Sequence, residues 1–128
     1  MYTTYYMIDF GTYIRDRREA LRAENPRFSV RQVAMRIGVE PSYLSKVERQ
    51  LEAPPSEPKI RALAKDLDED PDYLLSIAGK ISDDLREAIC HRPQLLSELI
   101  RELKNLPDDA VLRIVRQARS GKPRKETP

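Results

Sequence analysis

The segment from Ser29 to Arg49, SVRQVAMRIGVEPSYLSKVER, constrains the fold of this chain more than any other stretch. Its first part has apolar residues at three- and four-residue spacing, which places them on one helical face: Val30, Val33, Ala34 and Ile37. Gly38 follows, and glycine adopts the left-handed conformation that ends a helix without a steric penalty. Pro41 then suits the first position of a second helix. The segment therefore predicts two short helices joined by a tight turn.

The second predicted helix has one apolar face and one face suited to a polyanion. Leu44 and Val47 turn inward, and the small Ala34 lets the two helices cross at a steep angle. The residues left mostly outside are hydroxyls, one aromatic ring and two cations, with no carboxylate: Ser42, Tyr43, Ser45, Lys46 and Arg49. This pattern is typical of a helix-turn-helix, whose second helix enters the major groove of DNA.

The positions on that helix suggest a role for each polar residue. Ser42 and Lys46 lie on its outer face, so we expect them to meet base edges, with the lysine favouring the acceptors of guanine. The flanking residues suit phosphate groups: Arg31, Tyr43, Ser45 and Arg49.

The chain resembles the Xre/Cro-repressor family from about Phe10 to Gly79. The family's Leu-Ala, turn glycine and Pro-Ser-Tyr-Leu-Ser-Lys-Ile-Glu-Arg are matched by Val33-Ala34, Gly38 and the run from Pro41 to Arg49. The resemblance implies an all-α fold with a five-helix domain that binds operator DNA, usually as a dimer. It also implies that Arg18 of the first helix pairs with Glu48, since a charge that faces a core needs a partner.

Three features depart from the family pattern. Gln50 stands where the family usually has glycine, so the turn after the second helix is open to a different conformation. Val30 replaces a polar residue that can hold a phosphate, a role that can pass to Arg31. The connection from Ala23 to Phe28 is longer than usual.

The rest of residues 9–79 also predicts helices. Asp9 can cap a first helix that extends to about Glu24, with Arg18 on an inward stripe formed by Phe10, Ile14 and Leu21. Ser56 can cap a fourth helix, whose apolar positions are Ile60, Leu63, Ala64 and Leu67. Asp70-Pro71 opens a fifth helix that Gly79 ends, with Tyr73, Leu74 and Ile77 inward. The carboxylates from Asp66 to Asp72 lack the spacing of a calcium loop.

Residues 80–119 predict three short amphipathic helices, which together carry more apolar surface than they can bury alone. These side chains are candidates for dimerisation: Leu95, Leu96, Leu99, Ile100, Leu103, Val111, Leu112 and Val115. They can pack on the first five helices, on a second copy, or on another protein. The sequence thus favours a repressor that binds a palindromic operator as a homodimer. The alternative is an antitoxin-like or adaptor protein that binds a partner through these helices and regulates its own gene.

Composition sets limits on other functions. The single cysteine, Cys90, excludes an internal disulfide and adjoins the single histidine, His91. We expect Cys90 to be a small buried residue and His91 to lie on the surface at a helix end; adjacent helical residues diverge by about 100°, which makes a poor metal site. No catalytic group of residues, metal site or cofactor is predicted.

The termini and the charge complete the prediction. Residues 1–8 predict a tyrosine-containing arm that covers the domain or a partner; contact with a DNA groove is the less favoured alternative, because the arm has no cation. Residues 120–128 predict a disordered basic tail. No apolar run approaches the length of a membrane span, and we expect a cytoplasmic protein of bacterial or phage origin. Residues 1–50 carry nine Lys and Arg against six Asp and Glu, whereas residues 51–80 carry four against seven. The positive charge therefore lies beside the proposed DNA-reading helix.

Overall fold

The computed structural model describes residues 8–121, and over this range the chain is all-helical. The elements are α1 (Phe10–Arg22), the 3-10 helix η1 (Pro26–Phe28), α2 (Val30–Ile37), α3 (Pro41–Glu48), α4 (Glu57–Leu67), α5 (Pro71–Ile77), α6 (Asp83–His91), α7 (Pro93–Leu103) and α8 (Asp108–Ser120). The chain divides into two compact units, Met1–Asp83 and Asp84–Pro128, so the division falls just after the expected end at Gly79. The all-α prediction is confirmed.

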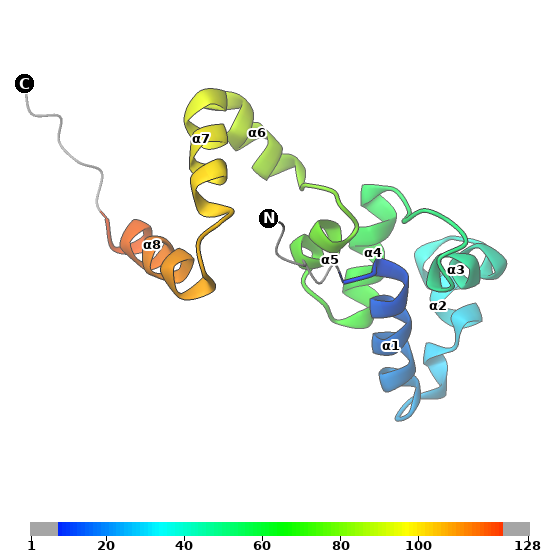
Figure 1. Ribbon diagram of the computed structural model, residues 1–128. Helices are drawn as coiled ribbons and strands as arrows, with labels where there is room; N and C mark the ends of the chain where they lie inside the picture. Colours follow the sequence, from blue (N-terminus) through cyan, green and yellow to red (C-terminus); the bar gives the residue numbers. More distant parts are fainter. Residues whose placement is uncertain (1–7, 122–128) are drawn as a thin grey trace, which may run out of the picture. The chain divides into compact units, whose positions relative to one another are not determined.

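In the first unit, α1 to α5 gather around one apolar core (Figure 1). The core contains the inward residues predicted for α1 to α4, with Leu21 and Val30 partly buried at its edge. The fifth helix differs from the prediction: Leu74 and Leu75 are fully buried, whereas Tyr73 remains 38% exposed. Tyr73 packs instead edge-on against Tyr13 of α1, with ring centroids 5.3 Å apart.

Four helices of this unit end with the same hydrogen-bond pattern. After α2, Gly38 is left-handed (φ 77°), and the next amide, that of Val39, donates back to the carbonyl of Ala34 at 2.9 Å. The same bond over five residues joins Leu51 to Lys46 after α3, Glu69 to Ala64 after α4, and Lys80 to Leu75 after α5. This arrangement satisfies carbonyls that have no partner within the helix.

The left-handed residue is glycine in only two of these four turns. Gly38 and Gly79 occupy it after α2 and α5, but Gln50 (φ 65°) and Asp68 (φ 55°) occupy it after α3 and α4. Gln50 therefore adopts the conformation that glycine would favour. Its side chain donates a hydrogen bond to the Thr12 hydroxyl at 3.0 Å, which ties the turn to α1.

The first helix ends at Arg22 with Ala23 as its C-cap, close to the predicted end near Glu24. Some other predicted details were wrong. Ser56 is the N-cap of α4, yet its side chain makes no capping hydrogen bond. Cys90 is exposed rather than buried, because its helix has no buried residue at all. Ser120 belongs to α8 and not to the tail.

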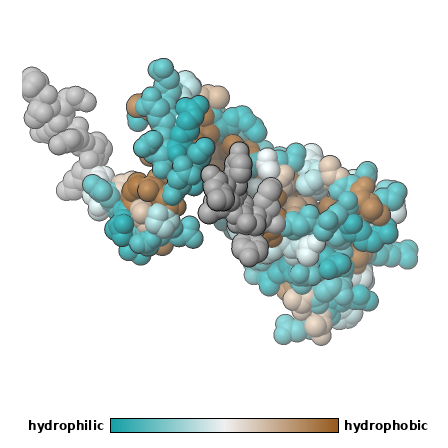
Figure 2. Space-filling model, viewed as in Figure 1, coloured by the Kyte–Doolittle hydropathy of each residue, from teal (hydrophilic) through white to brown (hydrophobic). Residues whose placement is uncertain are grey.

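The second unit contains amphipathic helices with no fully buried residue in α6, α7 or α8, all of whose residues are described. Leu95 is 63% exposed, and Leu99, Ile100 and Leu112 are about half exposed. Figure 2 shows these helices with hydrophobic atoms at the surface among hydrophilic ones. Within the described residues, no helix is both long and apolar enough to cross a membrane.

The predicted arm and tail lie largely outside the described residues, which omit 1–7 and 122–128. Ile8, the described residue of the arm, is exposed.

Candidate nucleic-acid interface

Helix α3 has two opposite faces. Leu44, Val47 and Glu48 point into the domain and are at most 5% exposed. Ser42, Lys46 and Arg49 are exposed and follow one another at four- and three-residue spacing, which places them on the side of the helix away from the core. The helix therefore presents a hydroxyl and two cations to solvent along one row.

The buried end of α3 is fixed to α1 by the ion pair that the resemblance implies. Arg18 donates from Nε and Nη2 to the two carboxylate oxygens of Glu48, at 2.7 and 2.9 Å. Its Nη1 donates to Glu19 at 2.6 Å and to the carbonyl of Phe28 at 3.1 Å. Burial alone would lower the pKa of Arg18, but the hydrogen bonds and charge of Glu48 and Glu19 raise it above its usual value. The pair is structural, and it orients α3.

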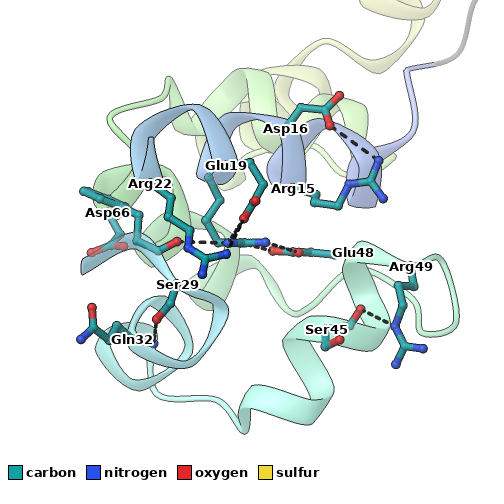
Figure 3. A network of polar contacts seen from close by, with 12 residues as sticks. Arg15, Asp16, Glu19, Arg22, Ser29, Gln32, Ser45, Glu48, Arg49 and Asp66 are labelled. Carbon is teal, nitrogen blue, oxygen red and sulfur yellow. Dashed lines mark hydrogen bonds and ion pairs between the residues drawn. The ribbon is translucent and has the colours of Figure 1, made fainter. Parts of the chain in front are cut away.

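Figure 3 shows the two directions that result. Glu48 points from α3 toward α1, and Arg49 points away from it, with Nε donating to the carbonyl of Ser45 at 3.4 Å. The adjacent residues Glu48 and Arg49 therefore have different roles. Glu48 anchors α3 to α1 through Arg18, and Arg49 belongs to the exposed row.

A glycine that the sequence analysis passed over permits the close approach of α1 to α3. A Cβ atom on Gly11 would lie 2.2 Å from the carbonyl oxygen of Val47 and 3.2 Å from that of Glu48. The two backbones meet there without an intervening side chain, so the position of α3 depends on this glycine. Its signal in the sequence is a glycine inside an otherwise helical pattern, which usually has a packing reason.

The turn between α2 and α3 is held from α4. Lys59 donates from Nζ to the carbonyls of Ile37 and Gly38, both at 3.1 Å. A cation at the C-terminus of α2 also complements the helix dipole. No local pattern in the sequence marks this contact, because it joins residues more than twenty positions apart.

The connection before α2, which we predicted to be longer than usual, contains two capped turns. Asn25 and Ser29 act as caps, with Asn25 Oδ1 accepting from the Arg27 amide at 3.0 Å and Ser29 Oγ from the Gln32 amide at 3.2 Å. The Gln32 side-chain amide, oriented to pair donors with acceptors, donates to the carbonyls of Arg27 and Pro26. Arg27 is exposed at this turn, near the N-terminus of α2.

The cations on α2 and α3 differ in their availability. Arg36 is held by two hydrogen bonds to Asp66, at 2.6 and 3.0 Å, and lies over the ring of Phe28 at 5.1 Å. Arg31 and Lys46 are exposed and form no ion pair with any residue that the structure describes. The single carboxylate within α2 and α3 is the buried Glu48. The outward faces of the two helices therefore present cations without a carboxylate, and the nearest exposed carboxylate in the sequence is Glu40 at the N-cap of α3.

Two of the side chains predicted to contact phosphates are less accessible than expected. Tyr43 and Ser45 flank the exposed row but are half-buried. Tyr43 packs against the core, and its hydroxyl donates a long hydrogen bond of 3.5 Å to the carbonyl of Ala53. Burial, with a smaller contribution from the charge of Glu52, raises the pKa of Tyr43. Tyr43 therefore remains a neutral donor at physiological pH.

The described residues contain no group of three or more His, Cys, Asp or Glu side chains that could hold a metal ion. His91 is exposed at the last residue of α6, as predicted.

Comparison with known proteins agrees with this geometry. A family model described as a helix-turn-helix domain matches residues 9–74, which cover more than half of the chain and include α1 to α4 and half of α5. No curated protein and no solved structure matches the chain. The matched segment contains the ion pair, the glycine-turned helix pair and the exposed row on α3. The chain belongs to the helix-turn-helix domain family, a family of DNA-binding domains.

Proposed function

We propose that this protein is a sequence-specific transcriptional regulator that represses by binding a palindromic operator as a homodimer. The observation that carries the proposal is the row formed by Ser42, Lys46 and Arg49 on α3. It is exposed, contains no carboxylate, and projects from a helix whose opposite face is fixed by Leu44, Val47 and Glu48. An outward-facing cationic helix held rigidly from behind can enter the major groove.

The exposure of each side chain supports a division of roles. Lys46 and Ser42 are fully outward on the second helix, so we assign them to base edges, with Lys46 favouring guanine N7 and O6. Arg31 near the start of α2 and Arg49 at the end of α3 are assigned to phosphates on either side of the groove. Ser45 is assigned to a phosphate through its hydroxyl. Tyr43 is assigned to a phosphate as well, and donating to it requires the phenol to release its long hydrogen bond to the Ala53 carbonyl.

The need for a dimer follows from the size of this surface. One short helix reads only a few base pairs, which is too little for specific affinity at physiological salt. Two copies related by a two-fold axis would place their α3 helices about 34 Å apart, one turn of DNA. The exposed apolar side chains of the second unit are our candidates for the dimer contact. They are partly exposed in the single chain, as expected of a surface that a second copy covers.

Selection of bound fragments from a random DNA pool tests this proposal. We expect an enriched palindrome whose half-sites are centred about 10 base pairs apart. Affinity for it should fall with added salt, but less steeply than for strongly cationic proteins, because Arg31, Lys46 and Arg49 provide few phosphate contacts. Affinity that does not change with salt, or a pool without enrichment, would contradict DNA reading by α3.

The exposed apolar side chains of the second unit also suit a second candidate function, a regulator whose C-terminal helices bind another protein. Light scattering on the purified full chain separates the two candidates. A stable dimer supports the repressor, whereas a chain that stays monomeric or aggregates favours an absent protein partner.

A further inference from the structure

Helix α8 carries an arrangement of charge and apolar side chains that is complementary to itself. Asp108, Leu112, Val115 and Arg119 are separated by four, three and four residues, so they form one row along the helix. The row begins with a carboxylate, continues with two apolar residues and ends with a guanidinium group. Reversing its direction exchanges the two charges.

The side chains of this row are available for a partner. Leu112 is 50% exposed and Val115 is 37% exposed, and no residue of α8 is buried. Asp109, next to the row, forms an ion pair with Arg113 one turn later, at 3.3 Å. Asp108 and Arg119 form no ion pair with any described residue of the chain.

We propose that α8 packs antiparallel against α8 of a second copy, across the two-fold axis of the homodimer. This inference rests on the proposed function, since it names the element that forms the axis. If the two-fold axis crosses the helix pair level with the midpoint between residues 113 and 114, Leu112 lies opposite the partner's Val115 near the centre. Asp108 then lies opposite the partner's Arg119 at each end. An antiparallel pair brings equivalent edges of the two helices together, so all four contacts lie along one seam.

A parallel pair does not gain these contacts. Asp108 would then lie level with the partner's Asp108, and Arg119 level with the partner's Arg119, where like charges repel or remain unpaired. The charges at both ends therefore select one orientation, and the apolar residues between them supply the burial.

The acidic start and basic end of α8 also favour its own helix dipole, so the test must separate that effect from pairing. Three full-length variants do so: Asp108→Arg, Arg119→Asp, and the two together. Each single substitution places two pairs of like charges across the axis and should weaken dimerisation about tenfold or more, measured by sedimentation equilibrium. The double variant exchanges the charges and should restore the dimer to within about threefold of the unaltered chain. If the charges act only on the helix dipole, the double variant will instead be the weakest of the three.

Cross-linking gives a second readout that does not depend on charge. In a chain with Cys90→Ser, we introduce Asp108→Cys and Arg119→Cys separately. The antiparallel pair keeps identical cysteines about 16 Å apart, beyond disulfide reach, so neither variant should cross-link alone while the mixture should. Self-linking of either variant would overturn the antiparallel arrangement and leave the homodimer intact. An unaltered chain that is monomeric would overturn the homodimer itself, together with this pairing.

Discussion

At the scale of single residues, the turn after α3 depends on Gln50 in a conformation that costs most side chains about 1–2 kcal/mol. Gln50→Gly removes this strain but also the hydrogen bond to Thr12, which is exposed and weak. We expect the free energy of unfolding to rise by about 0.5–1 kcal/mol, measured by urea denaturation.

Gly79→Ala is the matched control for this prediction. Gly79 has φ 76°, and a Cβ atom there would meet nothing within 4 Å, so the substitution tests the left-handed conformation alone. It should lower the free energy of unfolding by about 1 kcal/mol. If Gln50→Gly also destabilises the domain, the bond to Thr12 is stronger than its exposure indicates.

Gly11 is a residue whose replacement should damage packing. Alanine is the better helix former by about 1 kcal/mol, yet its Cβ would lie 2.2 Å from the Val47 carbonyl. We expect Gly11→Ala to lower the free energy of unfolding by about 2 kcal/mol and to weaken DNA binding, because α1 and α3 must separate. Ala20→Gly, at an exposed site of the same helix, should cost only about 1 kcal/mol. A stabilising Gly11→Ala would show that the two helices have room to adjust.

What the sequence predicts at this scale depends on the range of the interaction. The inward positions of α1 to α4 follow from periodicity, and the pair of Arg18 with Glu48 follows from the family resemblance. The hydrogen bond from Lys59 to the α2–α3 turn and the ion pair of Arg36 with Asp66 join positions far apart in the sequence. No local pattern marks either contact. The exposure of Cys90 was missed because its helix has no core to enter.

At the scale of elements, a polar cluster connects α1 to the turn between α4 and α5. Glu69 accepts from the Tyr13 hydroxyl at 2.6 Å and forms an ion pair with Arg17 at 3.0 Å. The hydrogen bond and charge of Glu69, with partial burial, raise the pKa of Tyr13 to about 12. This cluster is absent from the predicted contacts because Tyr13 lies off the apolar stripe of α1.

Because the pKa of Tyr13 is raised, the free energy of unfolding of the domain changes with pH in the alkaline range. Between pH 10 and 12 the folded chain retains the Tyr13 proton that the unfolded chain has lost, so stability falls as the pH rises through this window. Urea denaturation across that window should show a shallower decline for Tyr13→Phe than for the unaltered chain. Equal slopes would mean that Glu69 does not hold the phenol in its neutral form.

At the scale of the whole molecule, the sequence placed the helices of both units but could not identify what covers the second. Helix starts at Pro93 and Asp108 follow from local signals. The partner does not, because apolar stripes of this kind suit a second copy or another protein equally. In the single chain Leu95 is 63% exposed and Ile100 about half exposed, so either partner would cover apolar surface there.

Leu99→Asp together with Leu103→Asp tests the C-terminal unit as the site of dimerisation. Leu99 is 45% exposed and Leu103 is partly buried, so aspartates there put charge into the apolar surface of α7, which we expect to contribute to the dimer contact together with α8. We expect monomers by light scattering, with helical circular dichroism retained and operator affinity reduced by orders of magnitude. A variant that stays dimeric would show that α8 forms the dimer contact without α7. Loss of the helical signal would assign these leucines to the core of the single chain.

The most direct measurement of the central claim, that α3 reads DNA through its outward row, is the affinity of Lys46→Ala for the selected operator and for random DNA. The account predicts a loss of about 1–3 kcal/mol on the operator, relaxed preference at one base position, and little change on random DNA. Lys65→Ala, which removes an exposed lysine of α4, is the control and should bind as the unaltered chain does. Equal weakening on operator and random DNA would make Lys46 a phosphate contact, and unchanged binding to both would contradict the reading of DNA by this face of α3.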